Sequence, residues 1–477
     1  MNKRDFLKKS GLGVAGITLA PSIIMCKPET KITRLRTAHI GVGNMGFADL
    51  TDISSHPLVD VTALCDVDSN NLAKAKELHP NAKTFSDYRV MLKEMKNSID
   101  AVIVSTPDHT HAPASMLAMN MNKPVYCQKP LTHHVSEARA MKKLAEKKNL
   151  VTQMGIQVHS FYDYKLATLL IQSGIIGKVH TVHAWSPKNW GYDGEAPEGS
   201  DPIPETLDWN LWLGTSAKRP YKKDVYHPEN WRKLMDYGCG TLGDMGVHIF
   251  DTPYNALNLD VPKTIKNECR QPTGFGYPEK NVVTYEFPQT EYTTETLKWI
   301  WYDGSGAPNE HEDLILPGAI KKEASSTTQE KSLEDKMSLE TKTAAAGTLP
   351  NQGAMFVGEK GRLLLPHFMQ LPQKIVDGKY VDISSEINAI SKANNMGVPV
   401  RDYASEGPKH YHQFVDACLG KGACSAPFSY ASRLTETILL GVIAGRFPNQ
   451  TLHWDSEKAK FSEEEANQYL EGDYREF

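Results

Sequence analysis

The chain has 477 residues, which is more than one hydrophobic core usually supports, so we expect two or three domains. Hydrophobic residues make up 40% and aromatic residues 9% of the sequence, as in ordinary globular proteins. The formal net charge of −4 is spread over both signs without long runs, which argues against a surface that binds nucleic acid.

The first 30 residues are typical of an export signal. A basic start that includes Lys3 precedes an apolar, small-residue stretch at 11–25, which is too short for a stable membrane anchor. The arrangement resembles a twin-arginine signal and predicts a periplasmic or exported protein. Lys3 stands where the first arginine is expected, so ordinary secretion is the alternative. Cys26 is a candidate for lipidation, although Met25 before it is larger than that cleavage pattern prefers.

The stretch at 37–50 carries the clearest nucleotide-binding pattern. A short apolar run meets three glycines spaced G-x-G-x-x-G and continues in helix-forming residues, which is typical of a strand, a tight turn and a helix start. Gly41 permits the turn, Gly43 lets the backbone approach a pyrophosphate, and Gly46 lets the helix pack close to the sheet. An ordinary glycine-rich loop is the alternative. The predicted cofactor contacts in this stretch are Gly41, Gly43, Asn44, Met45 and Gly46.

A second apolar run, at 59–65, ends in an acidic residue. Asp66 lies about 20 residues beyond the last glycine, where the dinucleotide fingerprint places a carboxylate for the ribose hydroxyls. The next residues, Val67 and Asp68, supply no cation for a 2′-phosphate, so we predict NAD rather than NADP. A solvated carboxylate at a strand end is the alternative interpretation of Asp66.

Strands alternate with helices up to about residue 155, which predicts an α/β domain with a parallel sheet covered on both faces. The predicted helices cover 71–79, 86–96 and 113–121, and the predicted strands include 100–105 and 124–130. Thr106, Pro107 and His111 follow the first of these strands, and Lys129 and Pro130 end the second. Open α/β sheets bind ligands at the carboxyl ends of their strands, so we expect these residues beside the cofactor.

Three motifs together resemble the N-terminal half of the Gfo/Idh/MocA family, named for glucose-fructose oxidoreductase and inositol dehydrogenase. They are GVGNMG, STPDHTH and QKP. The resemblance implies a Rossmann domain at 34–155, followed at 156–477 by an α/β domain whose open, mainly antiparallel sheet carries a sugar site. It also implies an NAD(P) cofactor that Gln157 contacts, and we expect a homo-oligomer formed through the C-terminal sheet. The family usually has Glu-Lys-Pro, whereas this chain has Gln128 before Lys129, which weakens one polar contact near the cofactor.

The second half of the chain predicts a further sheet with flanking helices. Predicted strands lie at 179–185, 282–287 and 293–301, a hairpin at 354–366, and helices at 161–173, 407–419 and 430–444. Between them, residues at about 303–352 turn polar, which predicts a surface insertion.

Asp244 and His248 are four residues apart on a predicted helix that Thr241 would cap, so they share a face. By themselves these residues indicate a capping box and a core histidine. The resemblance implies instead that both line the substrate pocket opposite Lys129. It gives catalytic roles to Lys129 and His248 and a positioning role to Asp244.

The chemistry of sugar oxidation requires these residue types. A base must take the hydroxyl proton while hydride leaves the same carbon, and histidine titrates near neutrality. A lysine stabilises the developing alkoxide, while the cofactor carries the hydride.

Aromatic and polar residues between these motifs are candidates for stacking on a sugar and binding its hydroxyls, although aromatic residues also build cores and lids. The predicted substrate contacts are Lys129, Asn189, Trp190, Trp231, Arg232, Tyr237, Asp244 and His248. His159, His410 and His412 are weaker candidates for the same cleft. The seven cysteines form no C-x-x-C pair, so we expect no metal site.

Two functions remain open. The first is an NAD(P)-dependent oxidoreductase acting on a small-molecule sugar or glycoside. The second is a glycoside hydrolase or lyase that uses bound NAD for transient oxidation with no net redox change. An exported enzyme must regenerate its cofactor in place. Oxidation of one sugar coupled to reduction of another would do so, and so would the second function. A non-catalytic sugar-binding relative is a third possibility, against which Lys129 and His248 argue.

Overall fold

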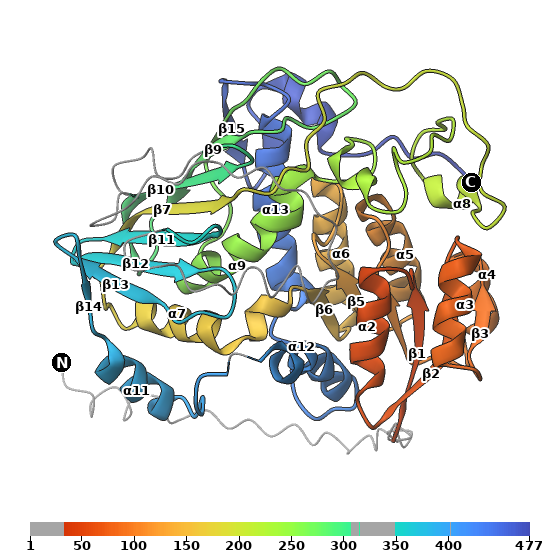
Figure 1. Ribbon diagram of the computed structural model, residues 1–477, viewed down its shortest axis with the longest axis horizontal. Helices are drawn as coiled ribbons and strands as arrows, with labels where there is room; N and C mark the ends of the chain where they lie inside the picture. Colours follow the sequence, from red (N-terminus) through yellow and green to blue (C-terminus); the bar gives the residue numbers. More distant parts are fainter. Residues whose placement is uncertain (1–32, 307–313, 315–348, 401) are drawn as a thin grey trace, which may run out of the picture. The chain divides into compact units, whose positions relative to one another are not determined.

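A computed structural model describes residues 33–306, 314, 349–400 and 402–477 (Figure 1). The export signal predicted for residues 1–30 and most of the insertion predicted for about 303–352 lie outside these residues. Within the described part of the chain, no helix is long and apolar enough to cross a membrane.

The N-terminal domain contains a parallel sheet of six strands in the order β3-β2-β1-β4-β5-β6. Its strands are β1 (Leu35–Ile40), β2 (Val59–Cys65), β3 (Lys83–Phe85), β4 (Ala101–Val104), β5 (Val125–Gln128) and β6 (Thr152–Gly155). Its helices are α2 (Met45–Ser54), α3 (Ser69–Leu78), α4 (Tyr88–Met95), α5 (Asp108–Asn120) and α6 (Val135–Lys148). Strands β4, β5 and β6 are buried along their whole length, as expected for a sheet covered on both faces. This arrangement confirms the predicted Rossmann fold.

The start of α5 corrects one predicted boundary. The sequence predicts a helix at 113–121, beginning at Pro113. The helix instead begins at Asp108, and Pro113 lies inside it. Asp108 therefore stands at the carboxyl end of β4, in the first turn of α5.

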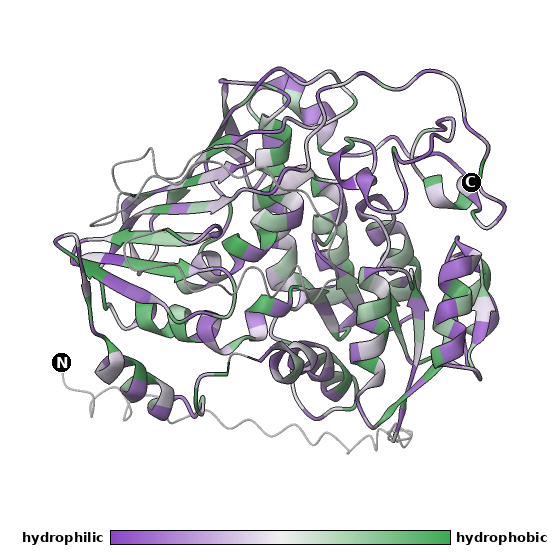
Figure 2. Ribbon diagram, in the orientation of Figure 1, coloured by the Kyte–Doolittle hydropathy of each residue, from purple (hydrophilic) through white to green (hydrophobic). Residues whose placement is uncertain are grey.

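The C-terminal domain contains a sheet of ten strands in the order β14-β13-β12-β11-β7-β10-β9-β8-β15-β16. Only β7 and β10 pair in parallel, so the predicted mainly antiparallel sheet is confirmed. Figure 2 shows that β11 and β12 are largely hydrophobic, whereas helix α3 is largely hydrophilic. The strands are β7 (Val179–Ser186), β8 (Thr264–Glu268), β9 (Val282–Pro288), β10 (Thr293–Asp303), β11 (Gly353–Gly358), β12 (Gly361–Pro366), β13 (Gln373–Val376), β14 (Lys379–Val381), β15 (Thr451–Asp455) and β16 (Lys460–Phe461).

Helices of the C-terminal half pack on this sheet and also return to the Rossmann domain. Helices α7 (Tyr162–Gln172) and α9 (Val247–Ala256) contact each other, and α9 also contacts β7 and β11. Helix α12 (Tyr403–Cys418) packs on α2, and α13 (Phe428–Ala444) packs along α6. The ring of Tyr411 on α12 stacks on Tyr126 of β5 at 5.4 Å between centroids. Two separate hydrophobic clusters each contain residues from both domains, so the domains pack directly on one another.

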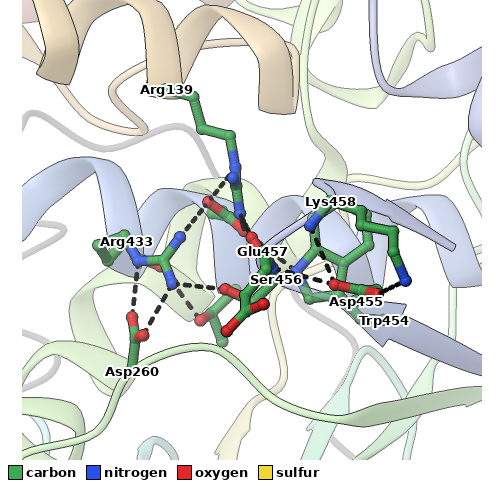
Figure 3. Close-up of polar contacts among 10 residues, drawn as sticks. Arg139, Asp260, Arg433, Trp454, Asp455, Ser456, Glu457 and Lys458 are labelled. Carbon is green, nitrogen blue, oxygen red and sulfur yellow. Dashed lines mark hydrogen bonds and ion pairs between the residues drawn. The ribbon is translucent and has the colours of Figure 1, made fainter.

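A buried glutamate also joins the domains. Glu436 on α13 is fully buried and accepts hydrogen bonds from Arg139 of α6 at 2.6 and 2.9 Å and from Arg433 at 2.8 Å. Arg433 also donates to Asp260, as Figure 3 shows. Because its charge is compensated from both sides, Glu436 fixes α13 against the Rossmann domain.

Candidate active site

One cavity, with a volume of about 340 Å³, lies between the two domains. Its first wall, defined here as the cavity residues up to Pro130, comes from the carboxyl ends of the parallel strands. Its second wall, the cavity residues from Gln157 onward, comes from the C-terminal half. The cavity therefore combines the predicted cofactor loop with the predicted substrate residues.

The glycine-rich loop forms the first wall between β1 and α2. Gly41 has a φ of +79°, and a side chain there would place its Cβ 2.6 Å from the carbonyl oxygen of Ser105. At Gly46 a Cβ would lie 2.2 Å from the carbonyl oxygen of Gly41. Asn44, Met45 and Gly46 line the cavity where α2 begins, so the helix N-terminus faces it. This cradle fits the pyrophosphate of a dinucleotide.

Asp66 lies at the end of β2 and is 9% exposed. One of its oxygens accepts a hydrogen bond from the backbone N–H of Val42 at 2.8 Å, and the other from that of Asp68 at 2.9 Å. Burial raises the pKa of Asp66, and these hydrogen bonds oppose the rise. The carboxylate therefore holds the glycine-rich loop in place and also faces the cavity, where it can accept ribose hydroxyls.

The neighbourhood of Asp66 is acidic. Asp87 also lines the cavity, where it pairs with Arg89 at 2.7 Å, and nearby Asp68 contacts His227 at 3.2 Å. Carboxylates at this end of the cavity repel the extra phosphate that NADP would carry. The geometry therefore agrees with NAD.

Lys129 and Asp244 meet across the cavity. Lys129 follows β5, and its Nζ donates to Oδ1 of Asp244 at 2.7 Å and to the backbone oxygen of Asp244 at 3.2 Å. Their side chains are 13% and 12% exposed. Trp190 Nε1 donates to the other carboxylate oxygen at 2.6 Å, and Nε of Arg232 lies 3.5 Å from Oδ1.

The charge of Asp244 is set by three cations. Burial alone would raise its pKa, but Lys129, Lys188 and Arg232 hold that pKa well below its ordinary value. Asp244 is therefore ionised at neutral pH and holds the ammonium of Lys129 in the cavity. The three cations outnumber this carboxylate, so the site favours negative charge that develops on a bound molecule.

Asp244 does not lie on a regular α-helix. It belongs to a π-helical turn, Leu242–Gly246, which leads into α9. The expected cap does not form, because Thr241 Oγ1 instead accepts a hydrogen bond from the backbone N–H of Trp190 at 2.8 Å. His248, in the first turn of α9, still lines the same cavity as Asp244 and Lys129.

His248 is held in its neutral form. Burial, together with the nearby positive charge of Lys129, lowers its pKa well below the ordinary value. Within the part of the chain that the structure describes, its buried Nδ1 has no hydrogen-bond partner. A neutral imidazole beside a lysine ammonium offers an acceptor for a hydroxyl proton.

Gln128 has a buried carboxylate partner. Its Nε2 lies 2.9 Å from both oxygens of Asp49, and its Oε1 accepts from the backbone N–H of Lys129 at 3.1 Å. Asp49 also accepts from Ser105 at 2.6 Å and from Tyr411 at 2.8 Å, and burial raises its pKa to about 6 against these bonds. A glutamate in place of Gln128 would set two carboxyl groups together. Asp49 therefore holds the side-chain amide of Gln128, and Gln128 in turn holds the backbone N–H of Lys129.

Most of the predicted site residues line this cavity. Trp190, Trp231 and Arg232 belong to the second wall, and the guanidinium of Arg232 lies 4.4 Å from the ring of Trp231. The other predicted residues that line the cavity are Gly41, Gly43, Asn44, Met45, Gly46, Asp66, Thr106, Pro107, Lys129, Pro130, Gln157, Asp244 and His248.

Three predicted contacts lie outside the lining. His111 is buried behind it, with its ring nitrogens 2.8 Å from the carbonyl oxygens of Thr106 and Pro130. Asn189 is exposed, and its side chain accepts from the backbone of Gly191. Tyr237 is fully buried in a cluster of aromatic residues.

The three weaker histidine candidates also lie away from the cavity. His159 contacts Asp251 at 2.9 Å, and His410 is buried between Ser160 and the backbone of Met154. His412 contacts Ser55 at the end of α2.

Sequence reasoning missed several cavity residues. Lys188 follows β7, and His367 and Phe368 follow β12, so their positions at strand ends were the only available signal. Asp108 was missed because α5 was expected to begin later. Burial raises the pKa of Asp108 to about 7, although Lys129 and Arg232 oppose the rise.

Comparison with known proteins agrees with this geometry. Residues 35–156 match the Gfo/Idh/MocA profile described as "Oxidoreductase family, NAD-binding Rossmann fold", and residues 162–286 match "Oxidoreductase family, C-terminal alpha/beta domain". Together the matches cover just over half of the 477 residues. The chain belongs to the Gfo/Idh/MocA family, and its cofactor is NAD.

Two curated relatives illustrate the range of this family. A glycosyl hydrolase family 109 protein from a Shewanella species is 26% identical over 205 residues, which are 38% of this chain and 44% of that protein. The uncharacterized oxidoreductase YrbE of Bacillus subtilis is 24% identical over 173 residues, which are 36% of this chain and 46% of that protein. The matches therefore span less than half the length of either relative.

Solved structures share the fold over almost the whole chain. The oxidoreductase domain protein from Kribbella flavida superposes with a TM-score of 0.59 at 20% identity, over 89% of this chain and 100% of that one. Levoglucosan dehydrogenase in complex with NADH and levoglucosan gives a TM-score of 0.56 at 15% identity, over 88% and 99%. At such identities the likeness establishes the fold.

Proposed function

We propose that the protein is an NAD-dependent oxidoreductase that acts on a hydroxyl group of a sugar or glycoside. The observation that carries this proposal is the placement of Lys129, Asp244 and His248 in one cavity with the glycine-rich loop. Bound NAD would supply the hydride acceptor. Levoglucosan dehydrogenase, which binds NADH and the sugar derivative levoglucosan on the same fold, supports the choice of substrate class.

The roles of the side chains follow from their charges. Neutral His248 accepts the proton of the substrate hydroxyl, and the ammonium of Lys129 stabilises the oxygen as negative charge develops on it. Asp244 accepts a hydrogen bond from Nζ of Lys129 at 2.7 Å and so holds the ammonium in place beside the substrate. Trp190 and Trp231 provide aromatic surface beside these groups, which suits the apolar face of a pyranose.

A second candidate is cleavage of a glycosidic bond through transient oxidation. In this cycle a ring hydroxyl is oxidised to a carbonyl, which acidifies the neighbouring C–H. Loss of that proton expels the aglycone, water adds, and the carbonyl is reduced again, so the cofactor ends as it began. The match to a glycosyl hydrolase family 109 protein favours this candidate. An exported location, as the first 30 residues predict, would favour it as well, because the cofactor is regenerated in place.

A panel of aryl glycosides separates the two candidates. The purified protein is mixed with each glycoside without added NAD, and both the released aglycone and the absorbance of reduced nicotinamide are followed. Aglycone release over many turnovers supports cleavage, whereas one equivalent of reduced nicotinamide without aglycone supports dehydrogenation. Lys147→Met, on the exposed face of α6, serves as a matched control for Lys129→Met. Neither product from any glycoside would refute cleavage, and NAD that also stays oxidised with free sugars would refute dehydrogenation.

A further inference from the structure

We propose that Tyr88, Trp212 and Phe477 form a clasp over the adenosine half of NAD and retain the cofactor through turnover. All three line the cavity, but they come from α4, from α8 (Trp209–Leu213) and from the segment that follows η6 (Glu464–Tyr469). The inference rests on the proposed function only in taking NAD as the ligand.

The position of the clasp follows from the order of the strands. Tyr88 begins α4 directly after β3, the outer strand of the sheet, which pairs with β2. Asp66, the predicted ribose contact, directly follows β2, whereas Lys129 follows β5, three places along in the order β2-β1-β4-β5. The clasp therefore lies at the ribose end of the cavity, away from the reactive lysine.

Phe477 is held firmly against the Rossmann domain. The guanidinium of Arg89 lies 3.9 Å from the centre of its ring, and Arg89 Nη1 donates to its backbone oxygen. The ring centre of Tyr88 is 6.5 Å away. The rings of Tyr88 and Phe477 both line the cavity and provide flat surfaces on which a purine stacks, while Arg89 holds Phe477 in place.

The segment before Phe477 is pinned to the opposite wall. Arg475 donates to the side chain and the backbone oxygen of Asn210 at 3.0 and 2.9 Å, and to the backbone oxygen of Ser216 at 2.7 Å. Its own backbone N–H donates to Thr215 at 2.9 Å. Residues 475–477 therefore tie α8 to α4 across the ribose end of the cavity.

A second connection runs beside the first. The segment at 187–240, here called the strap, leaves the C-terminal sheet after β7 and pairs with the residues that follow Asp66. The backbone N–H of Ser69 donates to Thr206 at 2.8 Å, and that of Asp208 donates to Val67 at 2.9 Å. Leu207 forms an antiparallel bridge with Asp68. The strap is thus joined to the Rossmann domain just before α8, the helix that carries Trp212 to the cavity.

These contacts predict slow release of the cofactor. For the adenosine half of NAD to leave, the protein must displace Phe477 or separate the strap from residues 67–69. In either case several hydrogen bonds of the protein break together. A cofactor that stays bound must be reoxidised where it lies. The clasp therefore favours a cycle without net redox change over a dehydrogenase that exchanges NAD at each turnover.

The test measures cofactor exchange directly. The full-length protein is loaded with isotopically labelled NAD, chased with excess unlabelled NAD, and the bound label is followed over time. We expect Phe477→Ala and Arg89→Ala to exchange on the order of tenfold faster or more than the unaltered protein. Tyr380→Ala removes an exposed aromatic ring from β14 and should exchange at the original rate.

Thermal unfolding of each variant shows whether it is folded. If Arg89→Ala is unstable, the exchange rate of Phe477→Ala alone decides whether the clasp retains the cofactor. Unchanged exchange in folded Phe477→Ala would overturn the clasp while leaving NAD binding intact. Fast exchange in the unaltered protein would overturn cofactor retention. Failure of the unaltered protein to bind NAD at all would instead refute the proposed function.

Discussion

The first wall of the cavity takes its residues from turns at the ends of β1, β2, β3, β4 and β5, whereas the second wall collects side chains mainly from a π-helical turn, α9, the strap and the segment after β12. The first wall presents backbone to its ligand, as the close approaches at Gly41 and Gly46 show. The second wall presents charged and aromatic side chains, such as Asp244, Trp190 and Trp231.

This difference separates two tasks. Backbone N–H groups at the start of a helix bind a phosphate group whatever molecule carries it, so the first wall suits a cofactor that many enzymes share. Side chains with fixed partners distinguish one substrate from another, so the second wall should determine what is oxidised. Lys129 is the exception, because it belongs to the first wall but is held by Asp244 of the second.

The largest effect should come from breaking the contact between the walls. Lys129→Met removes the cation that stabilises the developing alkoxide, so we expect turnover to fall about a thousandfold while NAD remains bound. Steady-state kinetics and the NAD content of the purified variant measure the two effects. Turnover that stays within about twofold of the unaltered protein would remove Lys129 from the chemistry.

A second prediction concerns Asp108, a buried carboxyl group of the first wall. Its pKa of about 7 in the folded protein lies above the ordinary value of 3.8, so the folded state holds this proton more tightly than the unfolded chain. The contribution of Asp108 to stability is therefore full below about pH 4, is lost as the pH rises, and levels off above about pH 7. The loss amounts to at most about 4 kcal/mol.

Chemical unfolding between about pH 4 and pH 8 checks this prediction. The free energy of unfolding of the unaltered protein minus that of Asp108→Asn should fall with rising pH, because other titrating groups cancel in the difference. A flat difference would show that Asp108 is ionised normally.

Two glycine variants test the backbone nature of the first wall. In Gly46→Ala the new Cβ meets the backbone of Gly41 at 2.2 Å, so we expect a loss of about 1–3 kcal/mol in stability together with weaker NAD binding. In Gly43→Ala the three heavy atoms nearest to the new Cβ all belong to the side chain of Asn71, which can move. That variant should keep its melting temperature and lose NAD affinity. Equal melting temperatures for the two variants would contradict the proposed packing.

The smallest effect is expected at Asp66. Asp66→Ala removes the ribose acceptor and the hydrogen bond to Val42, so NAD affinity should fall about tenfold with little change in turnover at saturating NAD. Asp60→Ala, on the same strand but in an exposed pair with Arg34, is the matched control. Titration with NAD gives both affinities, and equal values would show that Asp66 does not contact the cofactor.

The two walls also differ in how far they could be predicted from sequence. Parallel strands end at one edge of their sheet, so the motifs at Gly41, Asp66, Thr106 and Lys129 could be placed together from their positions in the chain. The main error on this wall was the start of α5, because Pro113 resembles a first-turn residue although it lies inside the helix.

Less of the second wall could be predicted from the sequence. Asp244 and His248 were predicted through family resemblance, because their spacing alone indicates an ordinary capped helix. In an antiparallel sheet consecutive loops lie at opposite ends of the strands, so a position after a strand does not by itself bring Lys188 or His367 to the cavity. Asn189 was predicted to line the cavity, whereas its neighbour Lys188 does so. Side chains alternate between the two faces only within a strand, and both residues lie after the end of β7, so the alternation could not show which of them faces the cavity.

The most direct test of the proposed hydride transfer is rapid mixing of the purified, NAD-loaded protein with glycosides and free sugars while the absorbance of reduced nicotinamide is recorded. We predict that at least one substrate reduces the bound cofactor within a single turnover, either transiently or to one equivalent. A fully loaded protein whose NAD stays oxidised with every sugar and glycoside would contradict hydride transfer at this site.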